Sequence, residues 1–200
     1  MSSAGSTGGF AAKPPALPTD DTAAEILAAS QERLARAGFE QYEVSAYASA
    51  GKECRHNLNY WSFGDYLGVG AGAHGKLTDV TTGTITRTTQ QREPRRYQSG
   101  SPHAIARNPV AACDLPFEFM MNALRLTRGF PIALYAERTG LEWDALAEKF
   151  AALRSRGLVA VAAGKCKPTP FGVGFLNEML LEFLPEKPVL TGKAAMSTGA

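Results

Sequence analysis

The chain has 200 residues, of which 44% are hydrophobic, and 21 Lys and Arg stand against 19 Asp and Glu, giving a net charge of +2. Such a balance creates no field strong enough to indicate binding to nucleic acid or to an anionic membrane surface. Without a long apolar run or a signal peptide, the sequence predicts a soluble, cytoplasmic protein with no membrane span.

Both ends of the chain are expected to be disordered. Residues 1–18 consist mostly of Ser, Gly, Ala and Pro, which cannot bury enough surface to offset chain entropy, and residues 185–200 read as a loose tail. A helix is predicted next, because Thr22 and Glu25 fit a capping box and Gly38 suits the left-handed residue that ends a helix. Its apolar face would carry Ala23, Leu27, Leu34 and Ala37.

The middle of the chain shows β-type patterns. Tyr42–Tyr47 alternates in polarity, which predicts a strand. A helix followed by a strand is half of an α/β repeat, so the partner strands are expected to come from elsewhere. Thr78–Thr89 is rich in Thr, and Thr82-Gly83 is predicted to turn a hairpin. Residues 91–115, which contain three prolines and several arginines, are predicted to be an irregular linker.

From Pro116 the pattern becomes helical. Three helices are predicted, closed by Gly129, Gly140 and Gly157, and Pro131 opens the second. The first helix has Phe117, Met120, Met121 and Leu124 on one face, and the third has Trp143, Leu146, Phe150 and Leu153.

A β-hairpin is predicted after these helices. Leu158–Ala162 and Cys166–Pro170 are its strands, Gly164 is its turn, and a last helix covers Phe175–Phe183. Three helices followed by a hairpin are typical of a winged-helix fold, so residues 116–184 are predicted to form a small winged-helix-like domain.

A winged helix would place the third helix on DNA. That helix carries charges of both signs, namely Glu142, Asp144, Glu148, Lys149, Arg154 and Arg156. Charges that cancel do not form a phosphate-binding surface, so contact with protein is favoured over nucleic acid.

The stretch from His56 to Trp61 is the candidate site. Histidine and tyrosine are both axial ligands of haem iron, so His56 and Tyr60 are candidates, and Trp61 offers a flat apolar surface for a porphyrin. Asn57 could orient the imidazole by a hydrogen bond. A structural alternative stays open, in which Tyr60 and Trp61 anchor a loop and His56 and Asn57 satisfy backbone groups.

A glycine-rich run follows, with the spacing G-x-G-x-x-G at Gly70, Gly72 and Gly75. In a dinucleotide-binding fold this run must open a helix, but here it leads into a Thr-rich, β-like stretch. The glycines are instead expected where another backbone or a ligand approaches closely. His74 either reaches such a ligand or has a structural role, which is the simpler reading.

The three cysteines are Cys54, Cys113 and Cys166. Their number is odd and their spacing wide, whereas a zinc or iron–sulfur site usually contains a close pair. They are predicted to be unrelated, reduced thiols.

Residues 38–78 resemble the HemW family of haem chaperones, which is related to oxygen-independent coproporphyrinogen III oxidase among the radical S-adenosylmethionine enzymes. The sequences HNLNYW and GVGAGAHG carry this resemblance. The segments Phe117–Gly129 and Phe171–Phe183 resemble the C-terminal domain of the same family.

The resemblance implies an α/β fold in which residues 19–90 are the end of a partial (β/α) barrel, followed by the C-terminal domain. It implies haem binding through His56, Asn57, Tyr60 and Trp61, with His56 as the metal ligand, and transfer of haem to an acceptor protein. The family also holds a [4Fe-4S] cluster and S-adenosylmethionine, but its CxxxCxxC motif is absent from this sequence. No radical chemistry, and hence no catalytic residue, is therefore expected of this chain alone.

The sequence thus predicts a truncated relative that binds haem. One alternative is a fragment of a coproporphyrinogen oxidase-like enzyme that acts only with a separately encoded, cluster-bearing barrel half. Another is a remnant or interaction module without activity. An open sheet edge would expose apolar surface, so self-association, for instance as a homodimer, is also expected.

Overall fold

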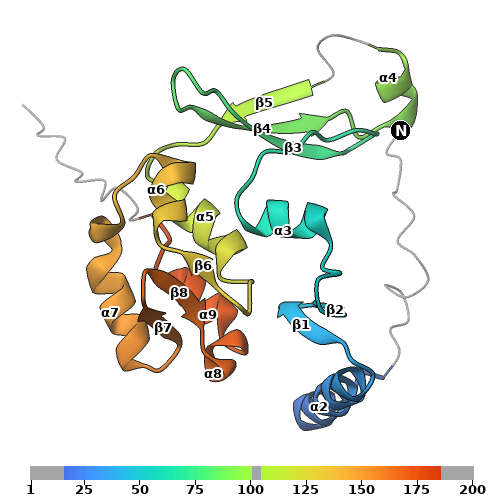
Figure 1. The fold of residues 1–200 in the computed structure, drawn as a ribbon. Helices are drawn as coiled ribbons and strands as arrows, with labels where there is room; N and C mark the ends of the chain where they lie inside the picture. Colours follow the sequence, from blue (N-terminus) through green and yellow to red (C-terminus); the bar gives the residue numbers. More distant parts are fainter. Residues whose placement is uncertain (1–15, 101–104, 186–200) are drawn as a thin grey trace, which may run out of the picture.

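The computed structural model describes residues 16–100 and 105–185, and Figure 1 shows three groups of elements. A helix and a small hairpin lie at one end, a helix beneath a three-stranded sheet lies in the middle, and a helical domain with a second sheet lies beside them. The predicted tail from residue 186 onward and most of the predicted disordered N-terminus lie outside the described residues. Among the described helices, none has the length and apolar character needed to cross a membrane.

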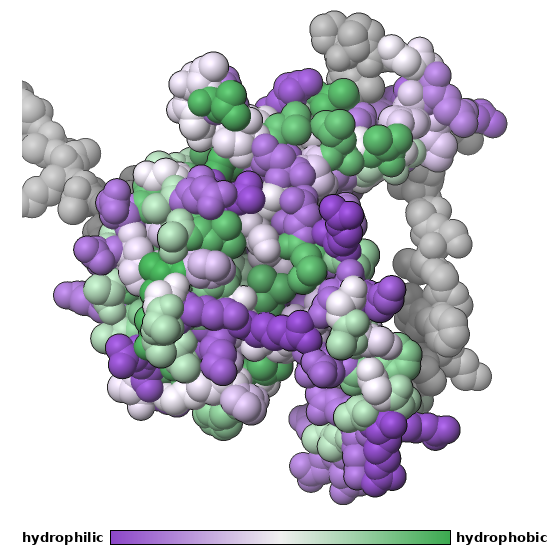
Figure 2. Space-filling model, in the orientation of Figure 1, coloured by the Kyte–Doolittle hydropathy of each residue, from purple (hydrophilic) through white to green (hydrophobic). Residues whose placement is uncertain are grey.

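Helix α2 (Asp20–Arg36) lies at the edge of the molecule. It begins three residues earlier than the predicted capping box, because the Thr19 hydroxyl accepts a hydrogen bond from the Thr22 amide at 3.3 Å. Gly38 follows it with φ +80°, as predicted. No residue of α2 is buried, so the predicted apolar face is not part of the core. Figure 2 shows a largely hydrophilic surface over this helix.

The predicted strand 42–47 is instead a hairpin of β1 (Glu40–Glu43) and β2 (Ala46–Ala48). The turn forms because the Glu43 carboxylate accepts hydrogen bonds from the amide and hydroxyl of Ser45, at 2.8 and 2.9 Å. The other edge of β1 meets Leu126 in an antiparallel bridge. The sequence suggested no neighbouring partner strand for this segment, and part of its pairing is therefore supplied by the C-terminal half of the chain.

Helix α3 (Arg55–Trp61) lies under the sheet formed by β3 (His74–Thr78), β4 (Ile85–Gln90) and β5 (Ile105–Pro109). The sheet is antiparallel in the order β3-β4-β5. The predicted hairpin is confirmed, and Gly83 lies in its turn with φ +71°. The linker prediction was wrong in part, because α4 (Pro94–Gln98) and β5 lie within residues 91–115. Proline starts α4 and ends β5, the positions where a missing amide costs least.

The C-terminal part has the predicted order of helices and hairpin. Its elements are α5 (Leu115–Ala123), β6 (Phe130–Pro131), α6 (Ala133–Thr139), η1 (Trp143–Leu146), α7 (Ala147–Ser155), β7 (Val159–Ala162), β8 (Lys165–Pro168), α8 (Pro170–Val173) and α9 (Leu176–Leu181). The third predicted helix begins with the 3₁₀ turn η1, the last predicted helix corresponds to α9, and the short helix α8 that precedes it was not predicted. The sheet order is β6-β8-β7, so the short β6 extends the predicted hairpin.

One aromatic cluster joins the C-terminal part to the middle of the chain. Phe119 of α5 is fully buried, and its ring meets those of Phe63, Phe130 and Tyr135 edge-on, with centroids 5.2–5.6 Å apart. Phe63 follows α3, so α3 is fixed to this core through its C-terminal end. The position of the candidate motif is therefore set by contacts with residues more than 50 positions away.

Candidate functional site

Helix α3 presents the four candidate residues in two pairs. Side chains four apart share a face of an α-helix, so His56 lies with Tyr60, and Asn57 lies with Trp61. The contacts of the two pairs differ, but the pairs adjoin each other, because the rings of Tyr60 and Trp61 meet edge-on with their centroids 4.6 Å apart.

The first surface is formed by His56, Tyr60 and Tyr66. His56 is exposed, and its ring centroid lies 6.4 Å from that of Tyr66 in an edge-on arrangement. The Tyr60 and Tyr66 centroids are 4.9 Å apart. Tyr66 is held over α3 because its amide and carbonyl exchange hydrogen bonds of 2.9 and 3.0 Å with Lys76 of β3. These three residues are called the His56 surface below.

The second pair is fixed toward the rest of the fold. The Asn57 amide donates to the Tyr42 hydroxyl at 3.1 Å, so its described hydrogen bond orients α3 on β1 rather than orienting His56. The Arg125 guanidinium lies 4.4 Å from the Trp61 ring centroid and also pairs with Glu43. One face of the indole is therefore covered by Arg125, which agrees with the structural alternative for Trp61, whereas Asn57 bonds a side-chain hydroxyl and not the backbone group which that alternative expected. Whether either residue contacts haem stays a prediction.

A polar network supports Tyr66 from the sheet. Arg87 of β4 donates to the Tyr66 hydroxyl at 3.1 Å and forms an ion pair with Glu118 of α5. Burial, together with the neighbouring Tyr60 hydroxyl, raises the pKa of Tyr66 to about 12. The Tyr66 phenol is therefore neutral at ordinary pH and contributes a flat, uncharged wall to the His56 surface.

A buried cation lies beside this network. The Lys76 side chain is 2% exposed, and its ammonium group is 2.6 Å from the Asp65 carboxylate and 4.3 Å from the Phe63 ring centroid. Burial lowers the pKa of Lys76 despite the opposing effect of Asp65. Partial burial acts to raise the pKa of the Asp65 carboxyl, but hydrogen bonds from Lys76 and Thr78 outweigh it, so this pKa is lowered.

The glycine-rich run brings two backbone segments into contact. A Cβ at Gly68 would collide with the His74 carbonyl, and one at Gly75 would lie 3.0 Å from the Gly68 nitrogen and 3.1 Å from the Tyr66 carbonyl oxygen. Gly70 and Gly72 have φ of +108° and +72° in the turn before β3. The predicted close approach of another backbone is therefore confirmed at Gly75 but not at Gly70, where a Cβ would meet nothing within 4 Å.

The cysteines are dispersed in the structure. Cys54 and Cys113 are exposed, and Cys166 is buried in the core. Burial raises the pKa of the Cys166 thiol to about 12, so this thiol stays protonated. In the part of the chain that the structure describes, no three His, Cys, Asp or Glu side chains are grouped so that they could hold a metal ion.

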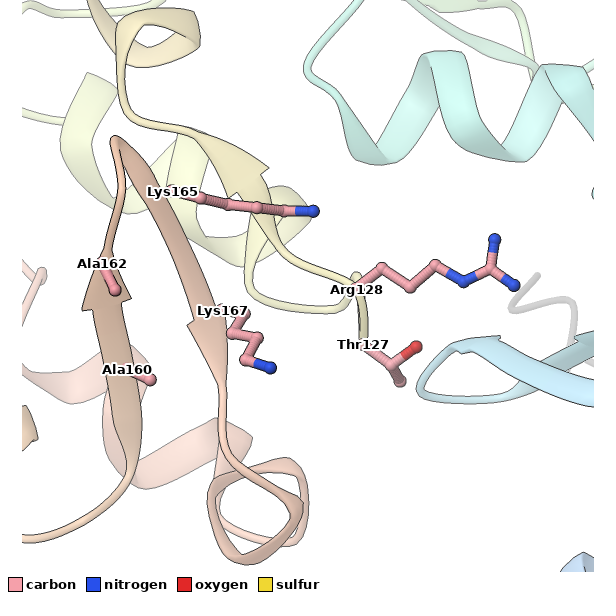
Figure 3. A pocket seen from close by; sticks show the side chains of 6 residues that line it. All are labelled: Thr127, Arg128, Ala160, Ala162, Lys165 and Lys167. Carbon is pink, nitrogen blue, oxygen red and sulfur yellow. The ribbon is translucent and has the colours of Figure 1, made fainter.

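A separate basic groove of about 420 Å³ lies on the C-terminal sheet. Figure 3 shows Lys165 and Lys167 extending from β8 toward the segment that carries Thr127 and Arg128. Arg128 is not free for a ligand, because it pairs with Glu40 and Glu53 at 2.7 and 2.8 Å. The groove lies on different elements from the His56 surface.

Sequence reasoning missed the residues that support the site. Tyr66 lies in the same dense segment as the motif, and the abundance of aromatic residues there was the available signal. Arg87, Glu118 and Arg125 lie on β4 and α5 or directly after α5. No local pattern marks them, because their role depends on contacts across the fold.

Comparison with known proteins gives consistent results. A family model described as the HemN C-terminal domain matches residues 110–175. The haem chaperone HemW of Escherichia coli is 42% identical over 177 residues, which are 88% of this chain and 46% of that protein. HemW of Haemophilus influenzae is also 42% identical, over 89% of this chain and 46% of that protein. HemW of Bacillus subtilis is 31% identical, over 85% of this chain and 45% of that protein. The chain thus spans about half the length of these relatives.

A solved structure supports the same relationship at the level of fold. Coproporphyrinogen III oxidase (HemN) from Escherichia coli, described as a radical SAM enzyme, superposes with a TM-score of 0.60 at 18% identity. The match covers 84% of this chain and 42% of the oxidase, and it confirms the predicted α/β class. The resemblance predicted from the sequence is therefore confirmed: the chain is similar to the HemW haem chaperones over about half of their length, and its residues 110–175 match the HemN C-terminal domain.

Proposed function

We propose that the chain binds haem on the His56 surface and hands it to an acceptor protein in the cytoplasm. Its relatives at 42% identity are named haem chaperones. The observation that carries the proposal is the pairing of an exposed imidazole, His56, with the flat ring of Tyr66 at 6.4 Å.

The residues of this surface fit haem chemically. His56 supplies a nitrogen ligand of the kind that haem iron takes, and its exposure leaves it accessible. Tyr60, four residues on, is the second candidate ligand. Tyr66, with its raised pKa, remains a neutral aromatic wall against which a porphyrin can pack. Haem cargo has to be released, and an exposed site permits transfer without opening the core.

The proposal gives Asn57 and Trp61 a supporting role. Asn57 holds α3 on β1 through Tyr42, and Trp61 is packed beneath Arg125. The face of Trp61 not covered by Arg125 is the part that could still contact a porphyrin. Loss of either side chain should therefore disturb the orientation of α3 as well as any direct contact.

The test is a titration of the purified chain with haem, following the absorption band. The wild-type chain should bind saturably, and His56→Ala should weaken binding at least tenfold or shift the band. His103→Ala is the matched control, because it removes a histidine outside the motif and should leave binding unchanged. A folded wild-type chain that never saturates would contradict the proposal, as would His56→Ala binding haem with an unchanged band.

The enzymatic alternative has weaker support. Likeness to the oxidase rests on 18% identity, whereas the chaperones share 42%. Cleavage of S-adenosylmethionine after mixing the chain with a separately expressed, cluster-bearing half would favour it. The acceptor protein and self-association also remain proposals, to be checked by cross-linking in the presence of haem.

A further inference from the structure

The strand β3 carries a second exposed histidine on the side of the sheet that faces α3. In an antiparallel sheet, alternate residues of a strand share a face, and so do residues directly opposite each other. His74 therefore shares its face with Lys76, and the register places Arg87 opposite Lys76. Lys76 contacts Phe63, at the end of α3, so this face is turned toward α3.

Tyr66 links this face to His56. It bridges to Lys76 in antiparallel fashion, and its hydroxyl accepts from Arg87. The Tyr66 ring is thus on the same side of the sheet as His74, and it contacts the His56 ring on α3. The helix thus brings His56 against the Tyr66 ring, and the sheet places His74 on the same face, two residues along β3 from the residue paired with Tyr66.

His74 and His56 also lie at similar distances along β3 and α3 from the residues that adjoin Tyr66. His74 precedes Lys76 by two strand residues, roughly 7 Å, and His56 precedes Tyr60 by four helical residues, roughly 6 Å. Figure 1 shows that α3 and β3 begin on the same side of the molecule, the side of α4. From the position of Tyr66, both histidines are therefore displaced in the same direction.

His74 is oriented in the manner of a metal ligand. Its Nδ1 lies 3.2 Å from the Thr89 hydroxyl on β4, and the ring is otherwise exposed. When Nδ1 carries the proton and donates to Thr89, Nε2 keeps its lone pair and points away from the bond. A hydrogen bond to one ring nitrogen is the usual way in which a ligating histidine is oriented.

From this placement we infer that His74 is a second axial ligand of haem iron, opposite His56, with Tyr66 beside the porphyrin. The inference rests on the proposed haem binding. It assigns a role to the GAHG segment, in which Gly75 lets the chain next to His74 pass close to the backbone of Gly68 and Tyr66. Both iron–nitrogen bonds are donor bonds, so no oxidant or reductant is needed.

The test is spectroscopic and uses the full chain loaded with ferric haem. The wild-type complex should be low-spin and six-coordinate, as expected for two imidazole ligands. His74→Ala should still bind haem saturably but become high-spin, and added imidazole should restore the low-spin spectrum. His74→Gln serves as a second variant that keeps the polarity of this site, and circular dichroism checks that each variant is folded.

Three outcomes separate the two proposals. A low-spin spectrum unchanged by His74→Ala would overturn the inference while leaving haem binding intact. Conversion to high spin by His103→Ala, and not by His74→Ala, would overturn it in favour of another histidine. A folded wild-type chain without saturable binding would overturn both proposals.

Discussion

Helices α2 and α5 show two different ways of forming a helix in this molecule. α2 has 17 residues and none is buried, whereas α5 has nine and buries five. α2 has the local signals: a Thr19 cap, acidic residues in its first turn and the exposed Arg36–Glu32 ion pair. α5 lacks a side-chain cap and is held by packing around Phe119. Helix length and capping therefore say little about which helix supports the fold.

The strongest test of this contrast is Phe119→Ala. Removing a fully buried ring that contacts three others should lower the free energy of unfolding by about 3–5 kcal/mol. Urea denaturation followed by circular dichroism measures the change. The control is Phe171→Ala, because Phe171 is 59% exposed and its loss should cost less than about 1 kcal/mol. Equal losses in both variants would contradict the assignment of the core.

The Lys76–Asp65 ion pair lies outside both helices, and its loss should cost less stability than the loss of Phe119. Asp65→Asn leaves Lys76 buried without a carboxylate and should cost roughly 1–3 kcal/mol at neutral pH. Because the pKa of Asp65 is lowered in the folded state, its stabilisation is present above the ordinary value of 3.8 and disappears as the pH falls through the lower, folded value. Denaturation at several pH values should show this acid-induced loss in the wild type and less of it in the variant.

Asp144→Asn is the matched control for this pair, since Asp144 is exposed at the start of the third helix. It should leave the pH profile unchanged. A profile that is identical in wild type and Asp65→Asn would show that the pair contributes nothing to stability.

The smallest effects are expected in α2. Leu27→Ser changes a side chain that is 56% exposed and should alter global stability by less than about 0.5 kcal/mol. Thr19→Ala removes the cap and should speed amide hydrogen exchange in α2 alone, because a cap contributes about 1 kcal/mol to its own helix. Mass spectrometry of exchanged peptides distinguishes α2 from α5. Faster exchange in α5 as well would mean that the two helices unfold together.

The sequence predicted elements well where a local signal fixed the backbone. The turn at Gly83 and the ends of helices at Gly38, Gly140 and Gly157 are confirmed, because a positive φ is a property that glycine tolerates locally. The same reasoning failed at residues 42–47, where the turn depends on the Glu43 side chain. It also failed at β5, whose residues are all exposed and which becomes a strand by pairing with β4.

For the candidate site, the sequence determined which residues form the motif, but not which of them contact the rest of the fold and which stay exposed. The composition of His56–Trp61 and of the glycine run identified the motif, because such residue types are rarely gathered without a structural or chemical reason. Only the tertiary structure showed that Asn57 and Trp61 are tied to Tyr42 and Arg125 whereas His56 stays exposed, since these contacts join segments far apart in the chain. It also brought Tyr66 and the face of His74 toward α3, because strand pairing joins residues that no local pattern connects.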